Sequence, residues 1–239
     1  MLSLDPQHLG DVLDDVRKVG QATGTEDKAE SIVSGMQGRI DAVVEGVSKA
    51  ASHAKVLHLE WVDPLMCGGH WVPEMVELAG GVNCFGDKEK GSYRMEWAEV
   101  LDSRPEIVIL LPCGFDVKRA LQDVPLLAQK EGWNDLPAVK DNRVYIIDAG
   151  AYTSRPGPRL VQGLEILAEM IHPELFSGLV PPDTVMKLDA ARASTCSPAT
   201  PRADPAAACS SNDSNRADTR GPPSHRSSCN VMRPARSTL

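Results

Sequence analysis

The stretch from residue 56 to residue 87 holds four side chains of types that bind metal ions: His58, Cys67, His70 and Cys84. Imidazole and thiolate groups suit zinc, but the chain has no CxxC spacing, which structural zinc sites usually show. His58 alternates with two leucines inside an apolar run typical of a strand. We therefore expect His58 to lie on one face of a sheet with a hydrogen-bonded neighbour, and we predict no metal site.

Nucleophilic catalysis has no support from the residue pattern. A GxSxG turn is absent, and Cys67, Cys84 and Cys113 have no acid or base at a recognisable spacing. Buried thiols of this kind usually serve as small core side chains. The run "GGVNCFG" has too few glycines in the right frame to cradle a phosphate. The sequence therefore predicts a protein that is not an enzyme and has no catalytic cofactor.

Aromatic and guanidinium groups in two glycine-rich and proline-rich loops indicate a different chemistry. Trp71 follows "CGGH" directly, and Tyr152 and Arg155 lie in "AGAYTSRPGPR". A flat ring and a planar guanidinium suit a large planar ligand with amide or phosphate groups. Trp71 has the alternative of packing against the base of its own loop, because large aromatics are usually partly buried. Arg155 has the alternative of a solvated surface position.

Charge and composition exclude several classes of protein. Residues 183–239 carry eight Lys or Arg and five Asp, and the preceding part carries 17 basic and 28 acidic residues, a net charge of −11. An acidic body argues against a nucleic-acid partner, because that binding depends on clustered cations. Three of the six cysteines lie beyond residue 182, and the odd number before it does not form a disulfide framework. No run of 18 apolar residues occurs, so we expect no membrane span.

Apolar periodicity predicts the elements that position these loops. Two helices come first: Asp5 is expected to cap the first, with Pro6 at its first position, and the second begins near Thr25. Three short apolar runs then predict buried strands at 55–61, 106–112 and 143–148. Helical patterns follow or separate them at 72–79, 97–101, 115–130 and 158–171.

Strands that alternate with helices predict an α/β layer with a mainly parallel sheet. Ligands of such sheets meet the loops at the carboxyl ends of the strands. These loops are residues 62–74, 112–119 and 149–159, and we expect them to line one cleft. From residue 183 onward the chain is rich in Ala, Ser, Pro and Arg without apolar periodicity. We expect disorder over 183–239.

The order of these features resembles the cobalamin-type class III substrate-binding proteins of ABC importers. The resemblance covers roughly Leu2 to Phe176. The opening "LSLDPQHLGDVLDDVRKVGQATGTEDKAESIVSGMQGRID" is similar to the end of the family's first lobe and its inter-lobe helix. The runs "EWVDPLMCGGHWVPEMVELAGGVNCFGD", "YRMEWAEVLDSRPEIVILLPCGF" and "NRVYIIDAGAYTSRPGPRLVQGLEILAEMIHP" are similar to its second lobe.

The resemblance implies a three-layer α/β sandwich, with an inter-lobe helical segment over 1–53 and a C-terminal ligand-binding lobe over 54–182. It implies non-enzymatic binding of a corrinoid such as cobalamin, through Trp71, Tyr152 and Arg155. His70 is an expected axial contact to cobalt, since imidazole suits that metal. It also implies docking on the membrane subunits of an ABC importer through Glu96 or Glu99. A single lobe should bind weakly, because half of the site buries only one side of the ligand.

Other functions stay open at this point. The ligand is cobalamin, another corrinoid, haem or a siderophore, because the fold accepts all of these. One alternative is an intracellular protein that handles metals or corrinoids, and another is a lobe that serves only as an interaction module. The family is periplasmic or extracytoplasmic. The N-terminus lacks the basic and apolar regions of a secretory signal, which predicts a cytoplasmic location if the sequence is complete.

Overall fold

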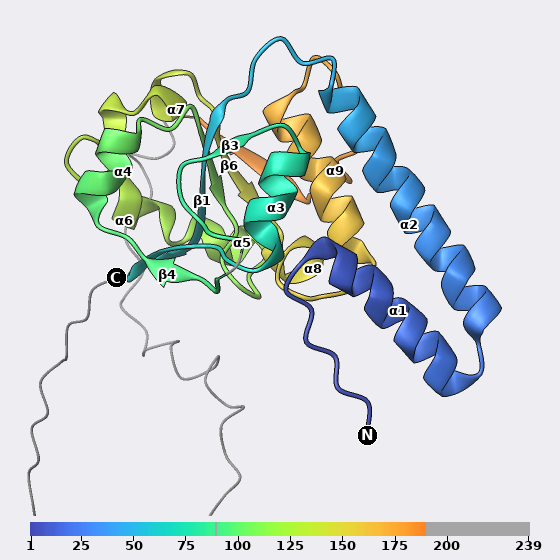
Figure 1. Ribbon diagram of the computed structural model, residues 1–239. Helices are drawn as coiled ribbons and strands as arrows, with labels where there is room; N and C mark the ends of the chain where they lie inside the picture. The colour runs from blue at the N-terminus through green and yellow to red at the C-terminus, as the bar shows by residue number, and fades with distance from the viewer. Residues whose placement is uncertain (89, 190–239) are drawn as a thin grey trace, which may run out of the picture. The chain divides into compact units, whose positions relative to one another are not determined.

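The computed structural model describes residues 1–88 and 90–189, and Figure 1 shows their arrangement. The helical elements are α1 (Leu9–Thr23), α2 (Glu26–Val47), α3 (Trp71–Leu78), α4 (Trp97–Ser103), α5 (Val117–Leu121), α6 (Val124–Ala128), the 3-10 turn η1 (Trp133–Asp135), α7 (Pro137–Lys140), α8 (Ala149–Tyr152) and α9 (Arg159–Ile171). The strands are β1 (Lys55–Val62), β2 (Leu65–Cys67), β3 (Val82–Asn83), β4 (Tyr93–Arg94), β5 (Ile107–Leu110), β6 (Val144–Ile147) and β7 (Val185–Leu188).

The strands form one mixed sheet in the order β4-β2-β1-β5-β6-β7, and β3 pairs with the beginning of β1. The central strands β1, β5 and β6 are parallel, with Leu57 opposite Val108 and Ile109 opposite Tyr145. Among the described strands, antiparallel pairing occurs towards the edges, between β1 and β2, β2 and β4, and β6 and β7. The three strands predicted from their apolar runs are therefore the parallel centre of the sheet.

Successive side chains of the central strands point to opposite faces and feed two separate cores. On β5, Ile107 and Ile109 belong to the core that α1, α2, α3 and α9 cover. The alternating residues Val108 and Leu110 belong to the core under α4 to α7. Figure 1 shows these two helical layers on either side of the sheet. The expected three-layer α/β fold is confirmed.

The first helix begins later than Asp5 and Pro6 suggested. It starts at Leu9, where two carboxylates bind the amides around its first turn, one from that turn itself and one from α3. The Asp11 carboxylate accepts hydrogen bonds from the amides of Gln7 and His8, both at 2.9 Å, and Glu74 of α3 accepts from the Leu9 amide at 2.7 Å. The expectation of a helix start at Pro6 was wrong because the N-cap is His8, held by Asp11, and Glu74 adds a tertiary contact to the Leu9 amide.

The predicted start of disorder at residue 183 was also wrong. Val185–Leu188 form β7, which completes the edge of the sheet beside β6. Four residues give too short a pattern to detect, and main-chain pairing with β6 provides the stabilisation. The remainder of that prediction, residues 190–239, lies outside the described residues. The single helix expected over 115–130 is two short ones, α5 and α6, because Pro125 begins a new helix.

The long helix α2 packs along α9, and one ion pair joins their polar sides. Arg39 Nε lies 2.7 Å from Glu165 Oε1, and a second guanidinium nitrogen contacts Oε2. The helical segment therefore lies directly on the α/β layer, while the functional division at residues 53 and 54 stays a prediction. Among residues 1–88 and 90–189, no helix combines the length and the apolar character needed to cross a membrane.

Two glycines of α2 should respond oppositely to alanine. A β-carbon at Gly38 meets nothing within 4 Å, whereas at Gly46 it would lie 2.6 Å from the Phe176 ring. Gly38→Ala should raise the free energy of unfolding by about 0.5–1 kcal/mol, because alanine loses less conformational freedom in a helix. Gly46→Ala should lower it by about 1–3 kcal/mol through overpacking. Urea unfolding measures both, and equal effects would contradict the described contact between α2 and Phe176.

Candidate functional site

Three loops at the carboxyl ends of β1, β5 and β6 are joined to one another by hydrogen bonds. The indole Nε1 of Trp71 donates to the carbonyl of Thr153 at 2.7 Å, which connects the first loop with the third. The Gly114 amide donates to Ser154 Oγ at 2.9 Å, and the Gly150 amide donates to the Phe115 carbonyl at 3.1 Å. The structure thus brings the three predicted loops together. That they line one ligand cleft stays a prediction.

Trp71 is the first residue of α3, and only 8% of its surface is exposed. Its ring belongs to the core between the sheet and α9, and its N–H group already has an acceptor. These contacts agree with the alternative considered from the sequence, in which Trp71 packs inside the protein. A role of Trp71 in ligand binding stays a prediction, and the burial of the residue leaves little of its surface for a ligand.

His70 caps the N-terminus of α3 in an unusual backbone conformation, with φ 52° and ψ −125°. The β-carbon of a non-glycine residue makes positive φ values costly, so the surroundings must hold this residue in place. Its amide donates to the Lys90 carbonyl at 3.0 Å, and its ring Nδ1 lies 2.9 Å from Gln7 Oε1. The ring lies 5.7 Å from that of Trp71, between centroids. His70 as a whole is half-buried.

Glu60 and Ser92 belong to the same region, and sequence reasoning missed both. Ser92 Oγ donates a hydrogen bond to Glu60 Oε2. Burial raises the pKa of the Glu60 carboxyl, while the Ser92 hydroxyl and the positive potential of His70 act in the opposite direction. A carboxylate near the end of the first predicted strand was a usable signal for Glu60. Its pairing with Ser92 could not be predicted, because the two residues are 32 positions apart in the sequence.

Tyr152 and Arg155 lie in the third loop, as predicted. Tyr152 ends α8 and is half-buried against the α9 side of the core. Arg155 is exposed, and it makes no ion pair with any residue in the described part of the chain. Both side chains leave the loop-joining hydrogen bonds to their neighbours Thr153 and Ser154. Their contact with a ligand stays a prediction.

The predicted docking residues lie at the beginning of α4, and both are exposed. Glu99 already serves the helix, because its Oε2 accepts a hydrogen bond from the Glu96 amide at 2.9 Å. Such a bond fixes the first turn of a helix. The Glu96 side chain in turn accepts from the backbone amide of Glu99, so the two residues cap the helix reciprocally. Docking through either residue stays a prediction.

The histidine and cysteine side chains considered as metal ligands do not come together in one site. His58 is fully buried: its Nδ1 accepts from the Gly68 amide at 3.2 Å, and its Nε2 donates to Asn83 Oδ1 at 3.1 Å. This confirms the expected hydrogen-bonded position in the sheet. Burial lowers the pKa of His58 to about 4, so the ring is neutral. Within residues 1–88 and 90–189, no group of three His, Cys, Asp or Glu side chains is arranged to hold a metal ion.

Cys67 and Cys84 form no disulfide bond. Cys67 is buried in the α4–α7 core, while Cys84 and Cys113 are half-buried. Burial raises the pKa of the Cys67 and Cys84 thiols, which disfavours the reactive thiolate form. Their expected role in packing agrees with these positions.

Gly69 lets the first loop approach residues 91 and 92. A β-carbon at this position would overlap the backbone of Gly91 and Ser92. Gly69→Ala should therefore lower the free energy of unfolding by about 1–3 kcal/mol. It should also disturb the Ser92 hydrogen bond to Glu60. Gly10→Ala is the matched control, because a β-carbon there meets nothing within 4 Å. Similar melting temperatures for the two variants would contradict the close approach.

Comparison with known proteins gives a family. Residues 2–151, more than half of the chain, match the family model described as periplasmic binding protein. An uncharacterized ABC transporter substrate-binding lipoprotein of Bacillus subtilis, YvrC, is 27% identical over 177 residues, which is 72% of this chain and 53% of the relative. The vitamin B12-binding protein of Vibrio cholerae is 29% identical over 98 residues, 41% of this chain and 32% of the relative.

Solved structures agree on the fold. The apo form of the periplasmic heme-binding protein RhuT from Roseiflexus sp. RS-1 is similar with a TM-score of 0.60 and 23% identity. The similarity covers 72% of this chain and 66% of that one. The chain spans about half the length of YvrC and about a third of the vitamin B12-binding protein.

Proposed function

This chain belongs to the periplasmic binding protein family, and on that premise we propose that it is a ligand-binding lobe of an ABC-type uptake system, with a corrinoid as its ligand. The observation that carries the ligand class is the 29% identity over 98 residues with the vitamin B12-binding protein of Vibrio cholerae. The lipoprotein relative of Bacillus subtilis, named as a transporter's substrate-binding component, supports the wider role.

The proposed binding surface consists of Tyr152, Arg155 and His70, and the largely buried Trp71 ring lies against His70. A corrinoid is a large flat macrocycle with amide side chains. The Tyr152 ring can pack against an apolar face, and the exposed Arg155 guanidinium can donate to amide carbonyls. The half-buried His70 ring offers a nitrogen to cobalt. These roles need no change in the hydrogen bonds that join the loops.

The proposed role is binding without catalysis. Burial raises the pKa of the Cys67 and Cys84 thiols. The buried His58 ring is neutral and forms hydrogen bonds with Gly68 and Asn83. Neither feature suits a nucleophile or a general base near neutral pH. Delivery to the membrane subunits of an importer would use the exposed carboxylates at the beginning of α4, Glu96 or Glu99.

Equilibrium dialysis against cyanocobalamin tests the proposal. The chain should retain the vitamin at high protein concentration, and Tyr152→Ala or Arg155→Ala should each weaken binding roughly tenfold. Arg94→Ala, which removes an exposed arginine on β4, is the matched control and should have no effect. Haem and a ferric hydroxamate are dialysed in parallel experiments. Retention of haem alone would show that the ligand is haem and not a corrinoid, and retention of none of the three would refute ligand binding by this lobe.

A further inference from the structure

Glu60 lies in an irregularity of β1, near the carboxyl edge of the sheet. Across β1 and β2, Leu59 is paired with Cys67, whereas Trp61 is paired with the adjacent Met66. Glu60 is therefore an extra residue of β1 without a partner on β2. A β-bulge of this kind bends the strand and redirects a side chain, and bulges are common beside functional sites. The bulge follows the last residue that β1 pairs with β5, which places Glu60 where the three loops begin to meet.

The two oxygens of the Glu60 carboxyl have different surroundings. Oε2 accepts the hydrogen bond from the Ser92 hydroxyl described above. Oε1 has no hydrogen-bond partner among residues 1–88 and 90–189, and it is not one of the enclosed polar atoms of the half-buried and buried side chains. Within the same residues Glu60 forms no ion pair. Ser92 thus holds the carboxyl in place while one oxygen stays open to a donor.

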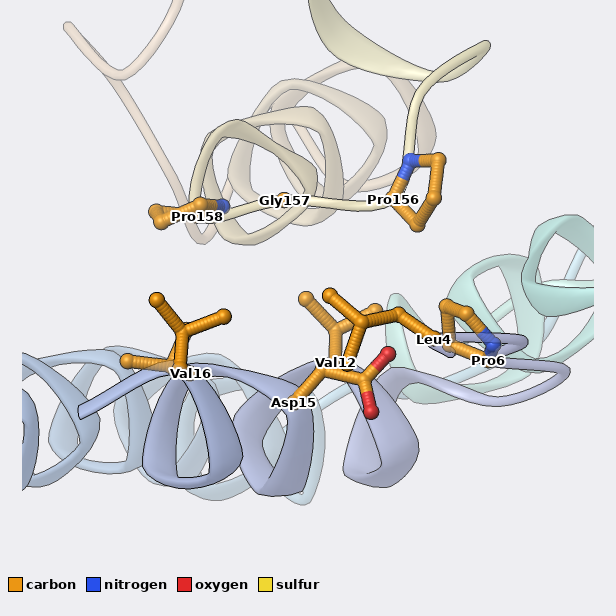
Figure 2. Close-up of a pocket in the computed structure, with 9 residues that line it drawn as sticks. Leu4, Pro6, Val12, Asp15, Val16, Pro156, Gly157 and Pro158 are labelled. Carbon is orange, nitrogen blue, oxygen red and sulfur yellow. The ribbon is translucent and has the colours of Figure 1, made fainter. Parts of the chain in front are cut away.

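Asp15 provides a contrast, because it is a carboxylate that no ligand can reach. It lies beside a cavity of about 280 Å³ between α1 and residues 156–158, as Figure 2 shows. Its Oδ1 accepts from Lys18 Nζ at 2.7 Å, and its Oδ2 is enclosed without a partner in the described part of the chain. Glu60 differs in both respects, since its carboxyl has an open oxygen and no lysine beside it.

A row of contacts connects Glu60 with the proposed corrinoid contacts. His70 lies close enough to Glu60 for the two charges to interact. The His70 ring lies 5.7 Å from that of Trp71, and the Trp71 indole donates to the carbonyl of Thr153, the neighbour of Tyr152. Tyr152 and the arginine after it offer a ring and donors. Glu60 adds a charged acceptor to the same region.

We propose that Glu60 selects the chemical class of the ligand: its open oxygen accepts N–H groups of amide side chains, and its negative charge excludes macrocycles that carry carboxylates at this edge. The inference rests on the proposed function, because it concerns the same site. An amide donor on a carboxylate makes a charge-assisted hydrogen bond, which is stronger than a neutral one. Two carboxylates brought together in a half-buried position repel each other. The amide arms of a corrinoid meet this requirement, and the propionates of haem do not.

Equilibrium dialysis of the full chain at pH 8 against two corrinoids tests the proposal. Dicyanocobinamide and dicyanocobyrinic acid share the corrin ring and differ in carrying amide arms or free carboxylates. The unmodified chain should bind the amide compound more tightly by about tenfold or more. Glu60→Gln keeps the shape of the side chain but removes the charge, so it should bring the two affinities to within about threefold of each other. An unchanged preference in a folded Glu60→Gln chain would overturn the proposal.

Asp15→Asn is the matched control, because it also removes one negative charge, at a carboxylate that lies outside the proposed contacts. It should keep the preference of the unmodified chain. A loss as large as that in Glu60→Gln would show that net charge, and not Glu60, causes the selectivity. Ser92→Ala is a milder second variant, which leaves the charge in place but removes the donor to Oε2. It should reduce the preference about threefold, and if Glu60→Gln does not fold, an unchanged preference in Ser92→Ala would overturn the proposal.

The two dialyses also separate this inference from the proposed function. If neither corrinoid binds the unmodified chain, both the proposed function and the selection by Glu60 are refuted. If both bind with equal affinity, or the carboxylate compound binds more tightly, only the selection by Glu60 is refuted and corrinoid binding stands. Tighter binding of the amide compound that depends on Glu60 and not on Asp15 is the expected result.

Discussion

Acidification from pH 6.5 to pH 4 is expected to lower the free energy of unfolding by about 3 kcal/mol through His58 alone. The buried ring has a pKa of about 4 in the folded chain, because burial penalises its charged form. In the unfolded chain it titrates near its ordinary value of 6.5. Between pH 6.5 and pH 4 this histidine binds a proton in the unfolded chain but not in the folded chain. The free energy of unfolding therefore decreases as the pH is lowered through this range, and the decrease ends near pH 4.

Urea unfolding at a series of pH values measures this effect, and His58→Gln isolates it. A glutamine can accept from the Gly68 amide and donate to Asn83, but it does not titrate. The variant should be less stable than the unmodified chain at pH 7 and lose the slope assigned to His58. His53→Gln changes an exposed histidine and should keep that slope. A His58→Gln chain with an unchanged slope would show that another group causes it.

Removal of the Trp71 side chain should be the most damaging single truncation near the loops. Trp71→Ala is expected to lower the free energy of unfolding by about 3–5 kcal/mol, the usual cost of deleting a buried large aromatic. Its ring is 8% exposed and its N–H group holds the Thr153 carbonyl of the third loop. Trp71→Phe should cost about 1–3 kcal/mol, because it leaves a buried acceptor without a donor.

Trp97→Phe is the matched control for the tryptophan prediction. The Trp97 side chain is half-buried, and its N–H group donates to the Glu131 carbonyl in an exposed position. Solvent can replace that donor, so the variant should cost less than about 1 kcal/mol. Thermal or urea unfolding compares the two variants. An equal cost for Trp71→Phe and Trp97→Phe would show that the bond to Thr153 does not join the loops as described.

The central strands and their loops were predictable because their signal is local. Runs such as "IVIL" bury both faces of a parallel strand, so they contain continuous aliphatic residues that can be recognised without neighbours. The edge strands were not predictable, since β3 and β4 have two residues each and depend on main-chain pairing with distant segments. The same applies to β7, whose partner β6 lies about forty residues earlier in the chain.

The candidate site was predicted by position but not by arrangement. Tyr152 and Arg155 lie where their loop placed them, at the carboxyl edge of the sheet. The burial of Trp71 depends on an acceptor 82 residues further along the chain, which no local pattern reveals. The contact between Glu60 and Ser92 is of the same kind. Fold class therefore follows from periodicity, whereas the exposure of one side chain follows from tertiary partners.

The hydrogen bonds between the three loops bear on how such a surface changes during evolution. In the third loop they use the Gly150 amide, the Thr153 carbonyl and the Ser154 hydroxyl, and they leave the side chains at 152 and 155 uninvolved. On the function proposed above, substitutions at those two positions would alter selectivity while the hydrogen bonds between the loops are kept. A lineage would then pass from one flat ligand to another by exchanging two residues, and a designer could follow the same route.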